Sequence, residues 1–198
     1  MADEANRVAA LEQELAAERQ ARQTLVEASL RLNSLLNLPE LLGAIMESAT
    51  ALLGAETSSL MLLDETTNEL TFSVATGEAG GSVKDLRVPA DRGIAGWVLE
   101  HDQTAVVDDV ASDQRFYGQI DQSSGFQTHS MLAMPLKIRD KAIGVVEVIN
   151  KQGEGKFSER DQELANALAA QAAVAIDNAR LYQQLADAVV ESRMSYRL

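Results

Sequence analysis

The sequence contains no cysteine, and this absence excludes several kinds of site at once. Without a thiol the chain has no disulfides, no thiolate ligands for zinc or iron–sulfur clusters, no cysteine nucleophile and no thioether link to a pigment. Histidine is scarce too, since His101 and His129 are the only two, and their spacing does not suggest paired metal ligation. We therefore expect no metal site and no cofactor, and we expect both histidines in loops or on the surface.

Basic residues are also few: 17 Lys and Arg stand against 30 Asp and Glu, which gives a formal net charge of -13. Such a field repels the phosphates of nucleic acids and anionic lipid headgroups. No apolar run approaches the roughly 18 residues of a membrane span, and the acidic N-terminus is unlike a signal peptide. These features predict a cytoplasmic protein that binds neither nucleic acid nor membrane.

Two long segments without glycine or proline flank a mixed central region. Residues 6–36 have apolar side chains at three-four spacing, which predicts a coiled-coil or bundle helix, with an isolated solvated helix as the alternative. A second helix is predicted from Ser158 to Val190, with Ser158 as its N-cap and Asp161 at the capping-box position. Its apolar residues follow a seven-residue pattern, which predicts a packing seam made of Leu164, Leu168, Ala175, Tyr182, Leu185 and Val189. The polar residues Gln171 and Asn178 fall in the same seam. We expect a parallel homodimer held by residues 6–36 and 164–190.

The central region alternates short apolar runs with turn-forming residues, which predicts an α+β domain. We expect a mostly antiparallel sheet of about five or six strands with helices on one face. A helix to about Leu53 comes first, a short helix covers 91–100, and a polar segment at 108–130 is expected to form a lid or pocket wall. The predicted strands are 57–64, 69–75, 86–89, 105–107, 131–138 and 142–149. The predicted domains are 1–37 (coiled-coil helix), 38–185 (the α+β domain) and 186–198 (helical extension).

Two features of this region bear on ligand binding. Residues 143–149 are almost wholly apolar, which predicts a central strand buried on both faces, with Glu147 as the exception. Glu147 either has a buried partner or points into solvent at a strand end. Gly93–Gly96 places small residues at a helix start, where free backbone amides favour an anion; close helix packing is the alternative. No nucleophile elbow, P-loop or dinucleotide fingerprint is present, so we expect no enzyme activity.

Residues 38–185 resemble a GAF domain, the small-molecule-sensing module of cyclic-nucleotide phosphodiesterases, adenylyl cyclases and bacterial signalling proteins. The most specific part is the Asn-Lys-(loop)-Phe-x-x-x-Asp-Glu motif of nucleotide-binding members. Here it is carried by Asn150-Lys151, Phe157 and Asp161, with Gln162 in place of the final Glu. The resemblance implies a structural ion pair between Lys151 and Asp161 that does not touch the ligand.

The resemblance also implies a set of ligand-binding positions. The amides of Ile94 and Ala95 are expected to receive the cyclic phosphate, and a lid that covers the purine is expected to carry Phe116, Tyr117 and Asp121. The remaining polar lining is expected from Ser59, Ser124, Thr128 and Glu147. One departure is the pair Ala75-Thr76, because several phosphodiesterase domains carry Phe-Asp there, with the ring stacked on the base.

The function implied by the resemblance is sensory and not enzymatic. We expect the chain to bind a cyclic nucleotide, with cAMP slightly preferred over cGMP, and to signal through the flanking helices of a homodimer to a downstream protein partner. Enzymatic and bilin-binding relatives depend on cysteines, which this chain lacks. The alternative is a ligand-free GAF module that dimerises or docks a partner protein.

Overall fold

The computed structural model describes three stretches of the chain, residues 38–77, 80–153 and 156–195; for residues 189–195 it describes the backbone alone. The helix predicted over 6–36 therefore lies outside the described residues. The chain divides into two units, and each is considered by itself: residues 38–177, and a second unit of residues 1–37 and 178–198. None of the described helices is both long enough and apolar enough to cross a membrane.

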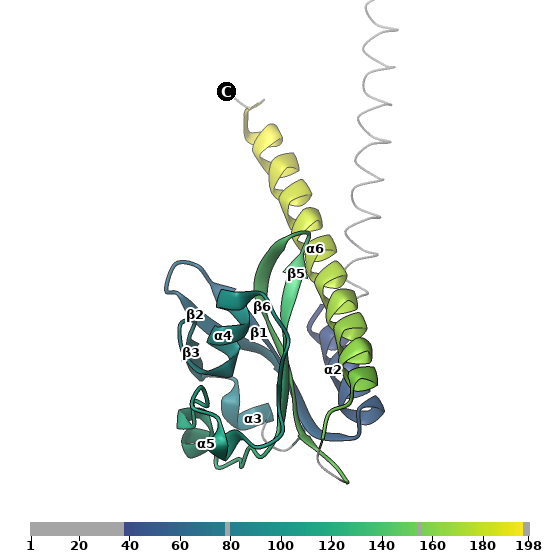
Figure 1. The fold of residues 1–198 in the computed structure, drawn as a ribbon. Helices are drawn as coiled ribbons and strands as arrows, with labels where there is room; N and C mark the ends of the chain where they lie inside the picture. The colour runs from purple at the N-terminus through teal and green to yellow at the C-terminus, as the bar shows by residue number, and fades with distance from the viewer. Residues whose placement is uncertain (1–37, 78–79, 154–155, 196–198) are drawn as a thin grey trace, which may run out of the picture. The chain divides into compact units, whose positions relative to one another are not determined.

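The first unit is built on one six-stranded sheet, which confirms the predicted α+β class (Figure 1). Its order is β3-β2-β1-β6-β5-β4, and each neighbouring pair is antiparallel. The strands are β1 (Ala55–Asp64), β2 (Glu69–Ala75), β3 (Arg87–Pro89), β4 (Ala105–Val107), β5 (Met131–Ile138) and β6 (Lys141–Lys151). A tight turn at Arg139-Asp140 joins β5 to β6, and Arg139 has a φ of 56° there. Pro89 lies on an edge strand, where its missing N–H costs no ladder hydrogen bond.

Helices cover both faces of the sheet, so the prediction of helices on one face was wrong (Figure 1). One face packs against α2 (Leu38–Leu52) and the first half of α6 (Glu159–Ser195). The other face is covered by α4 and by the segment before β5, and its short helices are α3 (Gly80–Val83), α4 (Gly93–His101), η1 (Val110–Ser112) and α5 (Gln119–Ser124). The reason is visible in β6, where Val146 and Val148 face α2 and α6 while Val145 faces the opposite core. A strand that is apolar on both sides requires cover on both sides.

The first half of α6 buries part of the predicted seam against its own domain. Leu168 is only 8% exposed and packs in the core against the sheet, so its assignment to a dimer seam was wrong. Leu164 and Ala175, two other members of the predicted seam, also pack against this core, so the helical pattern was right and its partner in this half of α6 is the sheet. The side of α6 that the domain leaves uncovered includes Val174, which is 60% exposed. In the second unit Leu181 and Leu185, four residues apart, are each 50% exposed.

Candidate functional site

A cavity lies between the sheet and the segment that runs from η1 to β5. Ten of the eleven predicted ligand-binding residues line it: Ser59, Ala75, Ile94, Ala95, Phe116, Tyr117, Asp121, Ser124, Thr128 and Glu147. The empty space of the cavity is about 710 Å³ when the solvent-filled opening is included. The part that can hold the centre of a water molecule is about 80 Å³. The structure therefore gathers these residues, which come from distant parts of the sequence, around one small cavity.

Thr76 is the predicted residue that does not line this cavity. Its hydroxyl lies 3.0 Å from the Thr50 hydroxyl on α2 and accepts a hydrogen bond of 2.9 Å from the Ser58 amide. Successive residues of an extended chain point to opposite faces of a sheet. Ala75 faces the cavity, so Thr76 faces α2 and has a structural role in place of the predicted one.

At the sheet wall of the cavity, one row of residues crosses four strands, β2, β1, β6 and β5. Ser59 on β1 lies opposite Ala75 on β2 and opposite Glu147 on β6, and Glu147 lies opposite Ala133 on β5. Ala75 is small, which leaves space above the row. Glu147 stands at the centre of the sheet and is only 7% exposed, so the alternative in which it points into solvent was wrong.

Glu147 is an acid in an apolar setting. Burial raises its pKa to about 7, the Ser59 hydroxyl opposes that rise, and the charge of Asp121 adds to it. The Ser59 hydroxyl donates to Glu147 Oε2 at 3.2 Å, and this is the one hydrogen bond to the carboxyl among the described residues. Glu147 Oε1 thus has no hydrogen-bond partner among the described residues, and Glu147 lines the cavity. A buried oxygen without a partner is costly unless a ligand or water satisfies it.

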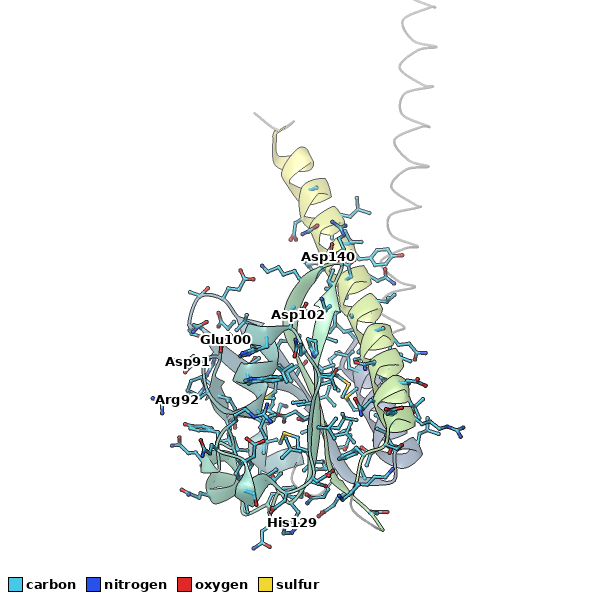
Figure 2. The ribbon with its side chains drawn as sticks, viewed as in Figure 1. Asp91, Arg92, Glu100, Asp102, His129 and Asp140 are labelled. Atoms are coloured by element: carbon cyan, nitrogen blue, oxygen red, sulfur yellow. The ribbon has the colours of Figure 1, made fainter. Side chains whose placement is uncertain are left out.

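The N-terminus of α4 forms a second wall. Its first helical hydrogen bond runs from the Gly96 amide to the Arg92 carbonyl at 3.0 Å, so the amides of Ile94 and Ala95 have no partner within the helix. The N-cap residue Arg92 makes no side-chain cap, and its side chain points away from the sheet (Figure 2). Gly93, at a φ of 76°, lets the chain enter the helix close to Tyr117, whose Cβ would lie 3.0 Å from an added Cβ. This wall offers unpaired N–H groups and the positive end of a helix dipole.

The lid predicted over 108–130 contains η1 and α5, and it is closed by its own hydrogen bonds. Asp121 in α5 accepts from the amide of Thr128 at 2.7 Å and from its hydroxyl at 2.8 Å. Ser124 donates to the Ile120 carbonyl at 2.8 Å and accepts from the Phe126 amide at 3.3 Å. These contacts fold α5 back on the segment that leads into β5. They hold Phe116, Tyr117 and Phe126 against the cavity.

A cation–π contact attaches the start of the lid to α4, and an ion pair within the lid holds the arginine that makes it. Arg115 Nη2 lies 2.7 Å from Asp113 Oδ2, and the Arg115 guanidinium lies 4.6 Å from the centre of the Trp97 ring. The hydrogen bonds from Arg115 outweigh the burial of Asp113 and hold the pKa of that carboxyl below its usual value. Trp97 in turn stacks on His101, which is exposed. The lid and α4 are therefore joined outside the cavity by a row of charged and aromatic side chains, Asp113, Arg115, Trp97 and His101.

The Asn-Lys motif lies at the other end of the lid and does not line the cavity. Asn150, at a φ of 59°, accepts from the His129 amide at 2.7 Å and donates to the Gln127 carbonyl at 2.7 Å. Lys151 Nζ lies 3.0 Å from Asp161 Oδ1 and 2.6 Å from the Leu53 carbonyl at the end of α2. The pair implied by the resemblance is present, and it joins β6 to both large helices. Phe157 is buried in the core beside it.

Comparisons with known proteins agree with this architecture. A family model described as GAF domain matches residues 37–176. The chain belongs to the GAF domain family. Two curated relatives are the probable 3′,5′-cyclic phosphodiesterase pde-5 of Caenorhabditis elegans, 29% identical over 163 residues, and the dual 3′,5′-cyclic-AMP and -GMP phosphodiesterase 11A of Takifugu rubripes, 32% identical over 157 residues. These matches cover 78% and 74% of this chain but only 22% and 17% of the two phosphodiesterases.

Solved structures share the fold across proteins with different names. The GAF domain of a phosphoenolpyruvate-protein phosphotransferase from Coxiella burnetii has a TM-score of 0.69 at 20% identity, and covers 80% of this chain and 93% of that one. A methyl-accepting chemotaxis protein fragment has a TM-score of 0.65 at 25% identity, over 77% of this chain and 96% of that one. The free methionine-R-sulfoxide reductase of Neisseria meningitidis, solved with its substrate, has a TM-score of 0.62 at 20% identity, over 73% and 81%. The fold alone therefore does not specify a ligand.

Sequence reasoning missed several residues that line the cavity of this GAF domain. On the strands these are Thr57, Met61, Phe72, Val88, Met131 and Ile149, and elsewhere they are Val83, Gly93, Ile120 and Phe126. Period-two alternation from Ser59 and Glu147 predicts Thr57, Met61 and Ile149, so part of this set was available from the sequence. The residues of the lid and α3 carry no comparable signal.

Asp161→Ala is expected to lower the free energy of unfolding by about 1–3 kcal/mol, because it leaves Lys151 without its partner. Burial disfavours ionisation of Asp161, but hydrogen bonds from Ser158 and Lys151 outweigh it and hold its pKa below the usual value. Asp161 also completes the predicted capping box, since Ser158 Oγ and Asp161 Oδ2 exchange hydrogen bonds with each other's backbone amides. Urea denaturation measures the loss.

The matched control is Glu159→Ala, which removes an exposed acid from the same first turn of α6. It is expected to cost at most about 0.5 kcal/mol, the scale of a helix-dipole interaction. Equal losses for the two variants would contradict a special role for the pair.

Proposed function

We propose that this GAF domain is a sensor for a purine 3′,5′-cyclic monophosphate, with cAMP slightly preferred over cGMP. The observation that carries the proposal is the cavity itself. It combines unpaired helix amides on one wall with a buried, half-partnered acid on the other, and a hydrogen-bonded lid closes over it. Two relatives that are named as cyclic-nucleotide phosphodiesterases support this ligand class.

The phosphate is assigned to the start of α4. The amides of Ile94 and Ala95 supply N–H donors to an anion, and Arg92 does not contribute because its side chain points outward (Figure 2). A net charge of -13 disfavours long-range attraction of an anion, so capture rests on local amides and the helix dipole. The purine is assigned to the space between Glu147 and the lid, under Tyr117.

Calorimetry of nucleotide-free protein with cAMP and cGMP tests the proposal. Thr128→Ala is expected to weaken binding by about 1–3 kcal/mol, because it removes the hydroxyl that holds Asp121 and the lid in place. Ser123→Ala changes the exposed side of α5 and is expected to leave affinity unaltered. If neither nucleotide binds below about 100 µM, a free energy near -5.5 kcal/mol, the nucleotide proposal fails.

We further propose that the protein is a parallel homodimer held together by residues 6–36 and by α6, and that α6 transmits the signal out of the domain. Leu181→Glu places a charge on the exposed apolar side of α6 beyond the domain, and it is expected to convert the dimer to a monomer in sedimentation while the domain keeps its melting temperature. Gln184→Glu adds the same charge at an exposed polar position and is the control. A wild-type protein that is monomeric at micromolar concentration contradicts the dimer.

The second candidate function is a ligand-free GAF module that dimerises or docks a partner protein. The observation that favours it is the small cavity volume of about 80 Å³, which is well below the roughly 300 Å³ at which ligand pockets begin. Under the first proposal the lid moves outward when the nucleotide enters. Added cAMP therefore raises the melting temperature if the first proposal holds and leaves it unchanged if the second does.

A further inference from the structure

The polar side chains around the cavity are almost all satisfied by the protein itself. The Thr57 hydroxyl donates to the Thr76 carbonyl at 2.6 Å, and Ser59 donates to Glu147. Asp121 and Thr128 hold each other, and the Ser124 and Tyr117 hydroxyls donate to residues of α5. Glu147 Oε1 is the exception among the described polar side-chain atoms of this lining. Among the described side chains of this lining, the Glu147 carboxyl is therefore the group with hydrogen-bonding capacity left for a ligand.

A carboxyl group presents two different hydrogen-bond patterns. In its neutral form it has one O–H donor and one C=O acceptor, whereas the carboxylate has acceptors only. The Watson–Crick edge of adenine has the N6 amino donor beside the N1 acceptor, and it therefore matches the neutral acid. The same edge of guanine has two adjacent donors, N1–H and the N2 amino group, and it therefore matches the carboxylate.

We propose that the proton on Glu147 selects the purine, so that the domain prefers the adenine nucleotide when Glu147 is protonated and the guanine nucleotide when it is ionised. This inference rests on the proposed function, because it requires a purine in the cavity. It goes beyond that proposal by making the ligand preference depend on pH. The cost of a mismatch is large, because a buried donor or acceptor that loses its partner is not compensated by water.

The surroundings allow both forms of Glu147 near neutral pH. Its pKa of about 7 arises from burial, with opposition from Ser59 and a contribution from the charge of Asp121. The other titratable groups in the described lining are Asp121 on α5 and Tyr117 before it, whereas β1, β2, β5, α3 and α4 contribute none. No Lys, Arg or His lines the described cavity, so no cation there fixes the carboxylate form.

Isothermal titration of nucleotide-free protein with cAMP and with cGMP, at about pH 5.5 and about pH 8.5, tests the inference. The ratio of the Kd for cAMP to the Kd for cGMP is expected to rise at least about tenfold between these two pH values. Titrations in buffers with different ionisation enthalpies are expected to show that cAMP binding takes up a proton at the higher pH. Binding of cGMP is expected to release one at the lower pH.

Glu147→Gln is the decisive variant, because its amide keeps one donor and one acceptor at every pH. It is expected to prefer cAMP at both pH values, with a constant ratio of the two Kd values. Glu69→Gln, the same change on β2 outside the cavity, is expected to keep the wild-type pH dependence. A pH-dependent ratio that persists in Glu147→Gln overturns the inference, because another group then selects the base.

The remaining outcomes separate the inference from the proposal beneath it. If both nucleotides bind wild-type protein but their Kd ratio is the same at both pH values, the inference is overturned and the proposed function stands. Glu147 then contacts a part that the two nucleotides share. If neither nucleotide binds at either pH, the proposed function itself fails, and the inference fails with it.

Discussion

Gly144→Ala is expected to lower the free energy of unfolding by about 3 kcal/mol or more, because the added methyl has no space in the centre of the sheet. A Cβ at this position would lie 2.0 Å from the Met61 carbonyl oxygen and 3.1 Å from the Leu62 Cα. Both are backbone atoms of β1, so no side-chain rotation relieves the clash. β6 lies between β1 and β5, and Gly144 pairs with Leu62 on one side and Leu136 on the other.

The close approach has a visible origin in β1. The pairing of β1 with β2 shifts register between Leu60 and Met61, beside the carbonyl that approaches Gly144. Such an irregularity increases local twist, and a glycine opposite it lets the two backbones come together. Gly144→Ala forces β1 and β6 apart, and these strands form the sheet wall of the cavity, so ligand binding is expected to fall with stability.

Gly43→Ala is the matched control in the same domain. Gly43 lies inside α2, and an added Cβ there would meet no atom within 4 Å. Alanine is favoured over glycine in a helix by about 0.5–1 kcal/mol, so this variant is expected to be more stable than wild type. Urea denaturation of the three proteins measures both shifts. If Gly144→Ala unfolds at the wild-type urea concentration, the close packing of β1 on β6 is contradicted.

The strands and helices of the domain were largely predictable because they depend on local patterns. Turn residues at Arg139-Asp140 and the unbroken helical segment after Ser158 specify their elements without long-range information. The errors arose where a pattern fits two partners. The period of α6 fits either a second helix or a sheet, and Leu168 turned out to face the sheet.

The site was less predictable because its residues meet only after the chain has folded. The assignment of both Ala75 and Thr76 to one pocket ignored the alternation of a strand, which sends neighbours to opposite faces. The position of Glu147 could not be decided from its strand, since either a buried or an exposed carboxyl is compatible with a mostly apolar run. What buries it is the lid from Phe116 to Thr128, which is remote in sequence and polar in composition.

Two sets of carboxyl groups are expected to control stability in different pH ranges. Asp113 and Asp161 have lowered pKa values, so their carboxylates stabilise the folded state at pH values above their ordinary pKa. This stabilisation is lost as the pH falls below the ordinary pKa and through the lowered one. Glu147 has a raised pKa and acts in the opposite direction. Its stabilising effect is present below its ordinary pKa near 4.5 and is lost as the pH rises to about 7.

Glu147→Gln is therefore expected to make the ligand-free protein more stable than wild type at pH 8. The stability difference between variant and wild type is expected to grow by about 3 kcal/mol in favour of the variant between low pH and pH 8. The wild type must ionise a buried acid over this range, whereas the amide never ionises. Ser59 still has an oxygen to which it can donate, so the variant keeps that hydrogen bond. Urea denaturation of both proteins at about pH 5 and about pH 8 measures the change.

Glu69→Gln controls for the removal of one negative charge from a protein whose net charge is -13, since Glu69 is partly exposed on β2 and pairs with Arg87 at 3.6 Å. It is expected to show no comparable gain at the higher pH. Parallel stabilities of wild type and Glu147→Gln across the range would mean that Glu147 ionises as easily in the folded as in the unfolded chain. In that case water reaches the carboxyl, and the lid does not close over it as the structure describes.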